Sequence, residues 1–206
     1  MIIKVCGMRD SVNIKEVDEI EEVTWMGFIF FPRSSRNVES LPEYLPQHTK
    51  RVGVFLKSDT DTLLKRISDF GLDFVQLHGH ETPEYCKELL QHTNGKVKII
   101  KMIQIETLED LNIVSDYKGI ADYLLFETKT KDYGGSGRQF DWEILRHYRG
   151  SIPFLITGGI GKDDAERLKS FQHPMFAGID LNSKCEISPA LKDVEAIKTF
   201  IKRYKQ

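Results

Sequence analysis

The chain has 206 residues, of which 40% are hydrophobic and 29% charged, and its formal net charge at pH 7 is -2. This length suits one substantial core rather than two full domains, and the nearly balanced charge argues against nucleic acid or an anionic membrane as a partner. No apolar run approaches the roughly 20 residues that a membrane-spanning helix needs, and the first residues lack a signal-peptide pattern, so we expect a cytoplasmic protein.

Short apolar runs rich in β-forming residues recur along the chain, and each is a candidate strand. In chain order they are residues 2–6, 24–31, 51–56, 73–78, 97–103, 122–127, 153–157 and 175–181. No low-complexity segment or linker rich in proline and glycine interrupts them. We therefore expect residues 1–206 to form a single domain.

Between the strand candidates, apolar residues recur at three- and four-residue spacing, which predicts helices. The clearest sets are Val12, Ile14, Val17 and Ile20, then Leu63, Leu64 and Ile67, and finally Val194, Ile197, Phe200 and Ile201. Residues suited to helix starts lie near several helical segments, namely Ser58, Asp59, Thr82, Pro83 and Asp163.

Strand followed by helix, repeated through the chain, predicts a parallel sheet with right-handed crossovers. An open doubly wound sheet and a closed (β/α)8 barrel, the TIM barrel, both satisfy this pattern. The eight strand candidates favour the barrel, with short loops because a typical barrel takes about 250 residues.

Barrel enzymes carry their active sites at the carboxyl ends of the strands. Cys6 ends the first strand candidate and Glu127 ends the sixth, so the two would face each other across the barrel mouth. A free cysteine is more often a small buried hydrophobe than a reactive group. The three cysteines of the chain are far apart and lack CxxC spacing, which argues against a disulfide framework or a zinc site.

Lys4 precedes Cys6 by two residues, so both side chains should point into the barrel. A lysine beneath a thiol favours the thiolate. We therefore expect Lys4 to lower the pKa of Cys6 from its free value of about 8.5.

Two further strand ends suit anion binding. Gly158 and Gly159 lie in ITGGI ahead of a helix expected near Lys162, and Asn182 and Ser183 follow the last strand. Glycine lets backbone N–H groups approach an anion, a helix N-terminus adds a favourable dipole, and barrels often bind phosphate after strands 7 and 8. A plain turn would give the same glycine pair.

The segment FFPRSSRN follows the second strand candidate and holds Arg33 and Arg36. A guanidinium can grip a carboxylate through two hydrogen bonds, although surface arginines are often only solvated. YGGSGRQFDW, residues 133–142, lacks the lysine and the spacing of a P-loop, and we expect a flexible active-site loop there, with Phe140 and Trp142 anchoring the next helix. His78, at another strand end, fits a catalytic or a structural role equally well.

Several motifs occur in an order and spacing that resemble the phosphoribosylanthranilate isomerase family of tryptophan biosynthesis. They are KVCG, GFIFFPRSSR, RVGVF, QLHG, LLFETKT followed by YGGSG and FDW, ITGGI, and GIDLNSKCE. The resemblance runs from Ile3 to about Ile201, which is nearly the whole chain.

The resemblance implies an Amadori rearrangement of a phosphosugar that carries an anthranilate carboxylate, with no metal or organic cofactor. It makes Cys6 the general base and Glu127 the general acid. Arg36 would bind the anthranilate carboxylate, and Asp180 would contact the sugar or the amine. Gly158, Gly159, Asn182 and Ser183 would form the phosphate site. The protein would be a monomer or a homodimer.

Two positions depart from the family pattern. The family has an aspartate where this chain has Glu127, which places a carboxyl group of similar acidity one methylene further out. Ala190 replaces a glycine that is common in the family. The first departure leaves open an impaired or non-catalytic phosphosugar-binding barrel. The related aminoaldose isomerase of the histidine pathway, which works with two aspartates, is disfavoured because it lacks the cysteine of the first strand.

Overall fold

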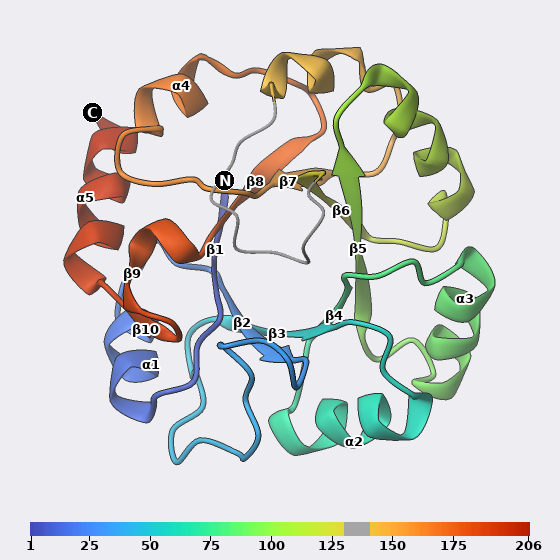
Figure 1. The fold of residues 1–206 in the computed structure, drawn as a ribbon, viewed down its shortest axis with the longest axis horizontal. Coiled ribbons are helices and arrows are strands. Elements are labelled where there is room, and N and C mark those ends of the chain that lie inside the picture. Colours follow the sequence, from blue (N-terminus) through green and yellow to red (C-terminus); the bar gives the residue numbers. More distant parts are fainter. Residues whose placement is uncertain (130–140) are drawn as a thin grey trace.

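Eight parallel strands close into a barrel in the computed structural model, which describes residues 1–129 and 141–206 (Figure 1). The strands are β1 (Ile2–Cys6), β2 (Trp25–Phe30), β3 (Lys50–Phe55), β4 (Phe74–Leu77), β5 (Lys98–Ile105), β6 (Tyr123–Thr128), β7 (Phe154–Ile156) and β8 (Phe176–Leu181). Each strand pairs with the next, and β8 pairs back with β1, where Asp180 lies opposite Lys4. The predicted (β/α)8 barrel is confirmed, and this closure excludes the open sheet.

Helices and 3-10 turns surround the barrel (Figure 1). They are α1 (Ser11–Asp18), α2 (Thr60–Phe70), α3 (Pro83–His92), η1 (Leu108–Tyr117), η2 (Trp142–His147), α4 (Ala165–Ser170), η3 (Ser183–Cys185) and α5 (Val194–Lys205). Asp59 caps α2 by accepting from Thr62 N, and Thr82 caps α3 with Pro83 as its first residue, as predicted.

The structure differs from the expected regular alternation in three places. Residues 31–49, between β2 and β3, hold no helix, and Pro42 and Pro46 lie in this segment, where each lacks the N–H that a helix interior needs. The short helix α4 begins at Ala165 with Asp164 as its N-cap, slightly later in the chain than the start expected near Lys162 and Asp163. An antiparallel hairpin of β9 (Glu186–Ser188) and β10 (Leu191–Lys192), which was not predicted, precedes α5.

The lower part of the barrel interior is apolar. One cluster of buried side chains fills it: Trp25, Val52, Phe74, Ile100, Met102, Leu125 and Leu155. The rings of Trp25 and Phe74 lie 4.3 Å apart between centroids, and Tyr123 adds an edge contact to Trp25 at 5.0 Å. A larger apolar core lies between the strands and the surrounding helices, and Ile14 and Val17 of α1 contribute to it. Val12 was expected on this apolar face but is 69% exposed.

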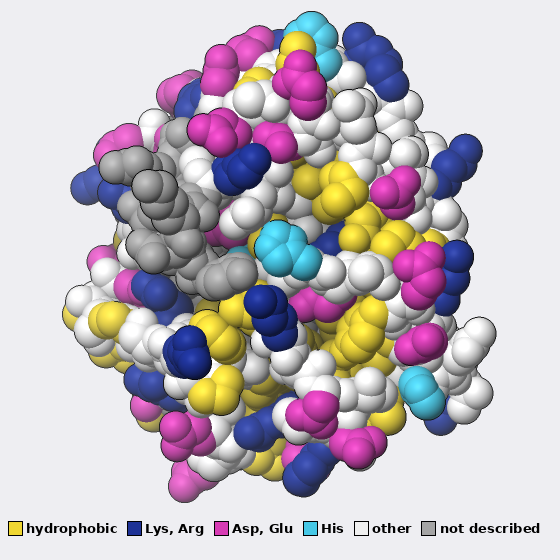
Figure 2. Space-filling view, turned by 45° about the vertical axis from the view of Figure 1, so that its right-hand side comes forward, with side chains coloured by type: hydrophobic (Ala, Val, Ile, Leu, Met, Phe, Trp, Pro, Cys, Tyr) yellow, Lys and Arg dark blue, Asp and Glu magenta, His cyan; other side chains and the backbone are white. Residues whose placement is uncertain are grey.

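The outer surface carries acidic and basic side chains interspersed rather than separated, on the face shown in Figure 2. This mixture agrees with the formal net charge of -2. Among the described residues, no helix combines the length and the apolar character that crossing a membrane would require.

Candidate active site

A cavity of about 280 Å³ opens at the carboxyl ends of the barrel strands. Five of the eight predicted site residues line it, namely Cys6, Arg36, Glu127, Asp180 and Asn182. Arg33, Ser34, Ser35, Gln76, His78 and Thr157 line it as well. The structure therefore brings together side chains from six segments that are distant in the sequence.

Cys6 lies at the last position of β1 and is 3% exposed, yet it lines the cavity. Gly27, on the neighbouring strand β2, provides the space beside it, since a Cβ at this position would lie 2.7 Å from Cys6 Sγ. The thiol is therefore buried against the barrel wall and still reachable from the cavity. Cys86 and Cys185 are also unpaired and buried, and burial raises the pKa of each to about 11.

Lys4 points into the barrel, as predicted, and forms an ion pair with Asp180. Its Nζ donates to Asp180 Oδ1 at 2.9 Å, and both side chains are almost completely buried. Thr157 Oγ1 lies 3.4 Å from the second carboxylate oxygen of Asp180. Burial lowers the pKa of Lys4, but Asp180 and Cys6 outweigh it, so the pKa is raised and Lys4 stays charged.

The expected lowering of the Cys6 pKa is wrong as a net effect. Burial raises the pKa of the thiol above its ordinary value, and Lys4 lowers it only in part. Desolvation penalises the thiolate more than the neighbouring ammonium stabilises it. The sequence pattern places the cation correctly but does not reveal how completely the thiol is removed from water.

Glu127 projects from β6 into the cavity and meets His78, which directly follows β4. His78 Nε2 lies 3.1 Å from Glu127 Oε2, and Gln76 Nε2 lies 3.3 Å from His78 Nδ1. With the Gln76 amide donating to Nδ1, the ring proton belongs on Nε2, where it donates to Glu127. His78 therefore holds one oxygen of the Glu127 carboxyl group.

Arg36 lies at the rim of the cavity, and its guanidinium is gripped by Glu186. Nε donates to Glu186 Oε1 at 2.9 Å and Nη2 donates to Oε2 at 2.6 Å. These hydrogen bonds raise the pKa of Arg36. We expected this guanidinium to bind a substrate carboxylate through two hydrogen bonds. Along one edge, the Glu186 carboxylate of the protein itself already makes these two hydrogen bonds.

The predicted phosphate-site residues lie at the ends of β7 and β8. Gly158 and Gly159 directly follow the cavity-lining Thr157 and have positive φ angles of 96° and 65°, a conformation that glycine favours. Asn182 lines the cavity, whereas Gly158, Gly159 and Ser183 are not among the described residues that line it. Because α4 begins only at Ala165, the expected helix dipole does not act directly after the two glycines.

Several residues of the site received no role from sequence reasoning. Gln76 and Thr157 lie at the carboxyl ends of two strand candidates, which made both of them candidates by position, and the structure confirms that both line the cavity. Glu186 and Lys192 belong to the unpredicted β9–β10 hairpin. Glu186 ends the motif GIDLNSKCE, but sequence reasoning assigned a role to neither residue. The glycine-rich segment expected to form an active-site loop lies, up to residue 140, outside the described residues, while Trp142 is buried at the start of η2 as expected.

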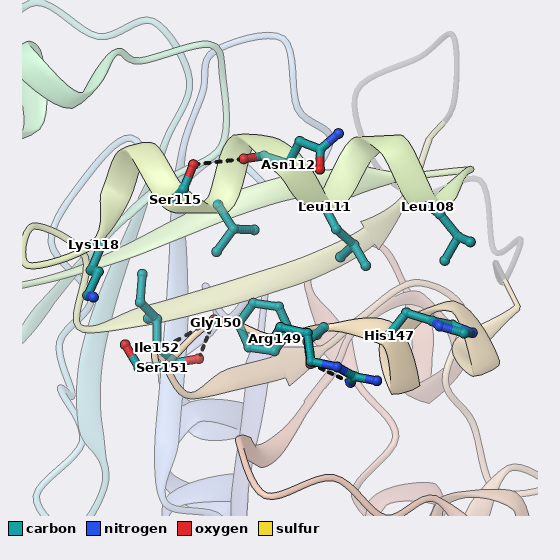
Figure 3. A pocket seen from close by; sticks show the side chains of 12 residues that line it. Leu108, Leu111, Asn112, Ser115, Lys118, His147, Arg149, Gly150, Ser151 and Ile152 are labelled. Carbon is teal, nitrogen blue, oxygen red and sulfur yellow. Dashed lines mark hydrogen bonds between the residues drawn. The ribbon is translucent and has the colours of Figure 1, made fainter.

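A second hollow, of about 640 Å³, lies outside the barrel between η1 and η2 (Figure 3). Leucines 108 and 111 line it together with His147 and Arg149, and none of the described lining residues is a cysteine or a carboxylate. Ser115 Oγ donates to the carbonyl oxygen of Asn112 within η1, so this hydroxyl is already bonded (Figure 3). The thiol of Cys6 and the carboxyl groups of Glu127 and Asp180 line the cavity at the barrel mouth instead.

Comparison with known proteins finds relatives that match this chain over nearly its whole length. The family model for N-(5'-phosphoribosyl)anthranilate (PRA) isomerase matches residues 3–203. A relative from Phocaeicola vulgatus, named N-(5'-phosphoribosyl)anthranilate isomerase, is 47% identical over 206 residues, covering 100% of this chain and 98% of the relative. One of the same name from Parabacteroides distasonis is 45% identical, covering 98% of this chain and 93% of the relative.

Solved structures extend the similarity to the fold. Phosphoribosyl anthranilate isomerase from Thermotoga maritima superposes with a TM-score of 0.83 at 28% identity, covering 100% of this chain and 99% of the other. A structure of this kind of isomerase in complex with reduced 1-(o-carboxyphenylamino)-1-deoxyribulose 5-phosphate has a TM-score of 0.79 at 25% identity, with the same coverage. The full-length match of the family model, the two relatives and the shared barrel together show that this chain belongs to the N-(5'-phosphoribosyl)anthranilate isomerase family.

Proposed function

We propose that this protein converts N-(5'-phosphoribosyl)anthranilate into 1-(2-carboxyphenylamino)-1-deoxyribulose 5-phosphate, an Amadori rearrangement in tryptophan biosynthesis. The observation that carries the proposal is a thiol and a carboxyl group, Cys6 and Glu127, in one cavity at the carboxyl ends of the barrel strands. Such a reaction needs one proton donor and one proton acceptor in fixed positions. The family membership of the whole chain supports the same reaction.

In the first step, Glu127 acts as the general acid. Its protonated carboxyl group transfers a proton to the ring oxygen of the ribose, the bond between C1 and that oxygen breaks, and a protonated Schiff base remains at C1. His78 contacts Glu127 through one oxygen at 3.1 Å and so restricts the carboxyl group to one orientation.

In the second step, the Cys6 thiolate acts as the general base. It removes the proton from C2 of the ribose, the electrons of that C–H bond form the C1–C2 double bond, and the nitrogen of the Schiff base becomes neutral. The resulting enol tautomerises to the ketone. Lys4 supports the thiolate because its charged Nζ lies beneath Cys6 and lowers the pKa of the thiol in part.

The remaining residues bind the substrate in this proposal. Arg36 pairs with the anthranilate carboxylate, because a guanidinium presents two edges to planar anions and Glu186 occupies one of them. Asp180 contacts the sugar or the amine. Backbone N–H groups at Gly158 and Gly159, together with Asn182 and Ser183, hold the phosphate, and the positive φ angles of the two glycines support a close approach.

The same proposal covers the wider setting of the enzyme. Residues 1–206 act as one domain in the cytoplasm, as a monomer or a homodimer. The reaction uses general acid and base groups of the chain and calls for no metal or organic cofactor. A non-catalytic barrel, which rested on glutamate in place of aspartate at position 127, finds no support among the relatives, which carry the isomerase name at 47% and 45% identity.

A fluorescence assay tests the proposal. The fluorescence of the anthranilate substrate should fall when purified protein is added, and Cys6→Ala should reduce this decay to the rate without protein. Absence of decay with micromolar wild-type protein would contradict the proposal.

A further inference from the structure

A buried cluster of charged residues lies beside the proposed catalytic pair, and its members come from three separate segments. Arg36 belongs to the connection after β2, Glu186 begins β9, and Lys192 ends β10. We propose that Glu186 and Lys192 are positioning residues that fix the guanidinium of Arg36, so that its remaining edge recognises the carboxylate of the substrate. This inference rests on the proposed function and assigns a task to the β9–β10 hairpin.

The hydrogen bonds of Glu186 define which edge of Arg36 is free. Nε and Nη2 both donate to the Glu186 carboxylate, at 2.9 Å and 2.6 Å for the shorter contact of each. Among the described residues, none accepts a hydrogen bond from Arg36 Nη1. Arg36 also lines the cavity. The edge formed by Nη1 and the second hydrogen of Nη2 therefore remains for a planar anion.

Lys192 ties this arrangement to the rest of the barrel. Its side chain is fully buried, and its Nζ donates to Glu186 Oε1 at 2.5 Å and to Asn182 Oδ1 at 2.7 Å. Its backbone is held from α1, where Asn13 Oδ1 accepts from Lys192 N at 2.7 Å and Asn13 Nδ2 donates to Lys192 O at 3.0 Å. A rigid cation therefore fixes one oxygen of Glu186 in place and, at the same time, orients Asn182.

The charges of the cluster leave room for one more anion. Arg36 and Lys192 are two cations around one carboxylate, so a single positive charge remains at the edge of the cavity. Burial alone would raise the pKa of Glu186, but the hydrogen bonds from Arg36 and Lys192 lower it, which keeps the carboxylate ionised. The remaining charge matches the single negative charge of an aromatic carboxylate.

Gly7 brings the cluster against the proposed base. Its φ is 79°, and a Cβ there would lie 2.8 Å from Arg36 Cδ and 3.0 Å from Asn182 Oδ1. Only glycine lets the chain that leaves Cys6 run this close to the cluster. A carboxylate on the free edge of Arg36 would thus be recognised next to the thiol, where the orientation of the substrate affects proton transfer most.

A pair of unreactive ligands tests the inference without depending on turnover. One is the reduced product, 1-(2-carboxyphenylamino)-1-deoxyribitol 5-phosphate, and the other is the same compound without the carboxyl group. The carboxylate preference is the ratio of their dissociation constants, measured by calorimetry. Glu186→Gln should reduce this preference about tenfold or more. Glutamine keeps the size of the side chain, but it loses the negative charge and places an NH2 group where one of the two accepting oxygens stands, so one donor of the cluster loses its partner. Lys192→Met should reduce it in the same direction.

Two controls separate positioning from folding. Glu81→Gln removes another buried carboxylate that pairs with a lysine, Lys101 at 3.1 Å, and should leave the carboxylate preference unchanged. In an Arg36→Met background, Glu186→Gln should cause no further loss of preference, since the residue acts through Arg36. Should Glu186→Gln fold poorly, Glu186→Asp keeps the charge, shortens the reach, and should give a smaller loss of the same kind.

The inference is overturned if Glu186→Gln weakens both ligands equally, or if its effect on the preference persists in the Arg36→Met background. Failure of the proposed function looks different, because wild-type protein would then show no substrate turnover. The ratio of dissociation constants decides the role of Glu186 in either case.

Discussion

The same strands form both ends of the barrel interior, but one end is an apolar core and the other is the polar cavity of the proposed active site. Leu125 and Glu127 are two residues apart on β6 and face the same interior. Leu125 packs in the apolar cluster and borders the cavity from it, whereas Glu127 brings a carboxyl group into the cavity. Phe74 and Gln76 on β4, and Leu155 at β7 with Thr157 just beyond it, repeat this change. Two residues along a strand thus separate a lower layer, the apolar cluster around Trp25 and Phe74, from an upper layer, the polar side chains that line the cavity.

The difference between the layers is energetic. The lower layer removes large apolar side chains from water, which stabilises the fold. The upper layer buries the ion pair of Lys4 and Asp180. The cost of removing both charges from water offsets much of their attraction, so this pair adds little to the free energy of unfolding. Substitutions in the upper layer should therefore affect catalysis, and substitutions in the lower layer should affect stability.

The largest expected effect is that of Cys6→Ala. Loss of the general base should lower kcat by about 10³-fold or more, within the range for acid–base groups, whereas the melting temperature should change little because few atoms are removed. The measurement is the decay of substrate fluorescence, with thermal unfolding followed in parallel. Activity within tenfold of wild type would remove Cys6 from its proposed role.

Glu127→Gln should have the next largest effect. The amide keeps the shape but cannot protonate the ring oxygen, so we expect kcat to fall by about 10²- to 10³-fold. Glu127→Asp is the matched control, because it restores the residue that the family carries, and its activity should equal or exceed that of wild type. Equal activity in Glu127→Gln and wild type would show that another group supplies the proton.

In the lower layer, Phe74→Ala should cost stability instead of activity. Removal of a buried ring that packs on Trp25 should reduce the free energy of unfolding by about 3–5 kcal/mol. At a temperature where the variant is still folded, kcat should stay within about threefold of wild type. Denaturant unfolding and the fluorescence assay measure the two quantities, and a large loss of kcat in folded protein would break the division between the layers.

The pH dependence of kcat/KM should reveal the ionisation of Cys6 in the upper layer. Cys6 acts as the thiolate, and burial raises its pKa, so kcat/KM should continue to increase with pH above the range in which an ordinary cysteine ionises. Lys4 lowers this pKa in part, so in Lys4→Met the increase should move to higher pH by about one unit or more. An unchanged profile in Lys4→Met, with the thiol titration also unchanged, would contradict a role for Lys4.

The smallest expected effect concerns Ala190, which has a φ of 67° in the turn between β9 and β10. This left-handed conformation costs an alanine about 1–2 kcal/mol, part of which glycine loses again through its greater freedom in the unfolded chain. Ala190→Gly should therefore raise the free energy of unfolding by at most about 1 kcal/mol. A clear destabilisation on denaturant unfolding would show that the turn is not strained.

Much of the barrel could be predicted from the sequence because strands buried on both faces form continuous apolar runs, and eight such runs alternate with other segments. The ends of those runs also identified Cys6, Glu127 and Asp180, which the structure places around one cavity. The β9–β10 hairpin has too few residues for a periodic pattern, so it was not predicted and neither Glu186 nor Lys192 was given a role. The direction of the Cys6 pKa depends on the balance between burial and the charge of Lys4, which spacing alone does not reveal.

The most direct test of the catalytic layer is a single-turnover measurement with substrate deuterated at C2 of the ribose. We predict that wild-type protein converts the deuterated substrate more slowly than the ordinary one, because Cys6 must break that bond. We also predict that Cys6→Ala gives only the uncatalysed decay with both substrates. Isotope-sensitive decay at the wild-type rate in Cys6→Ala would contradict the account, since the proton would then leave C2 without the thiol.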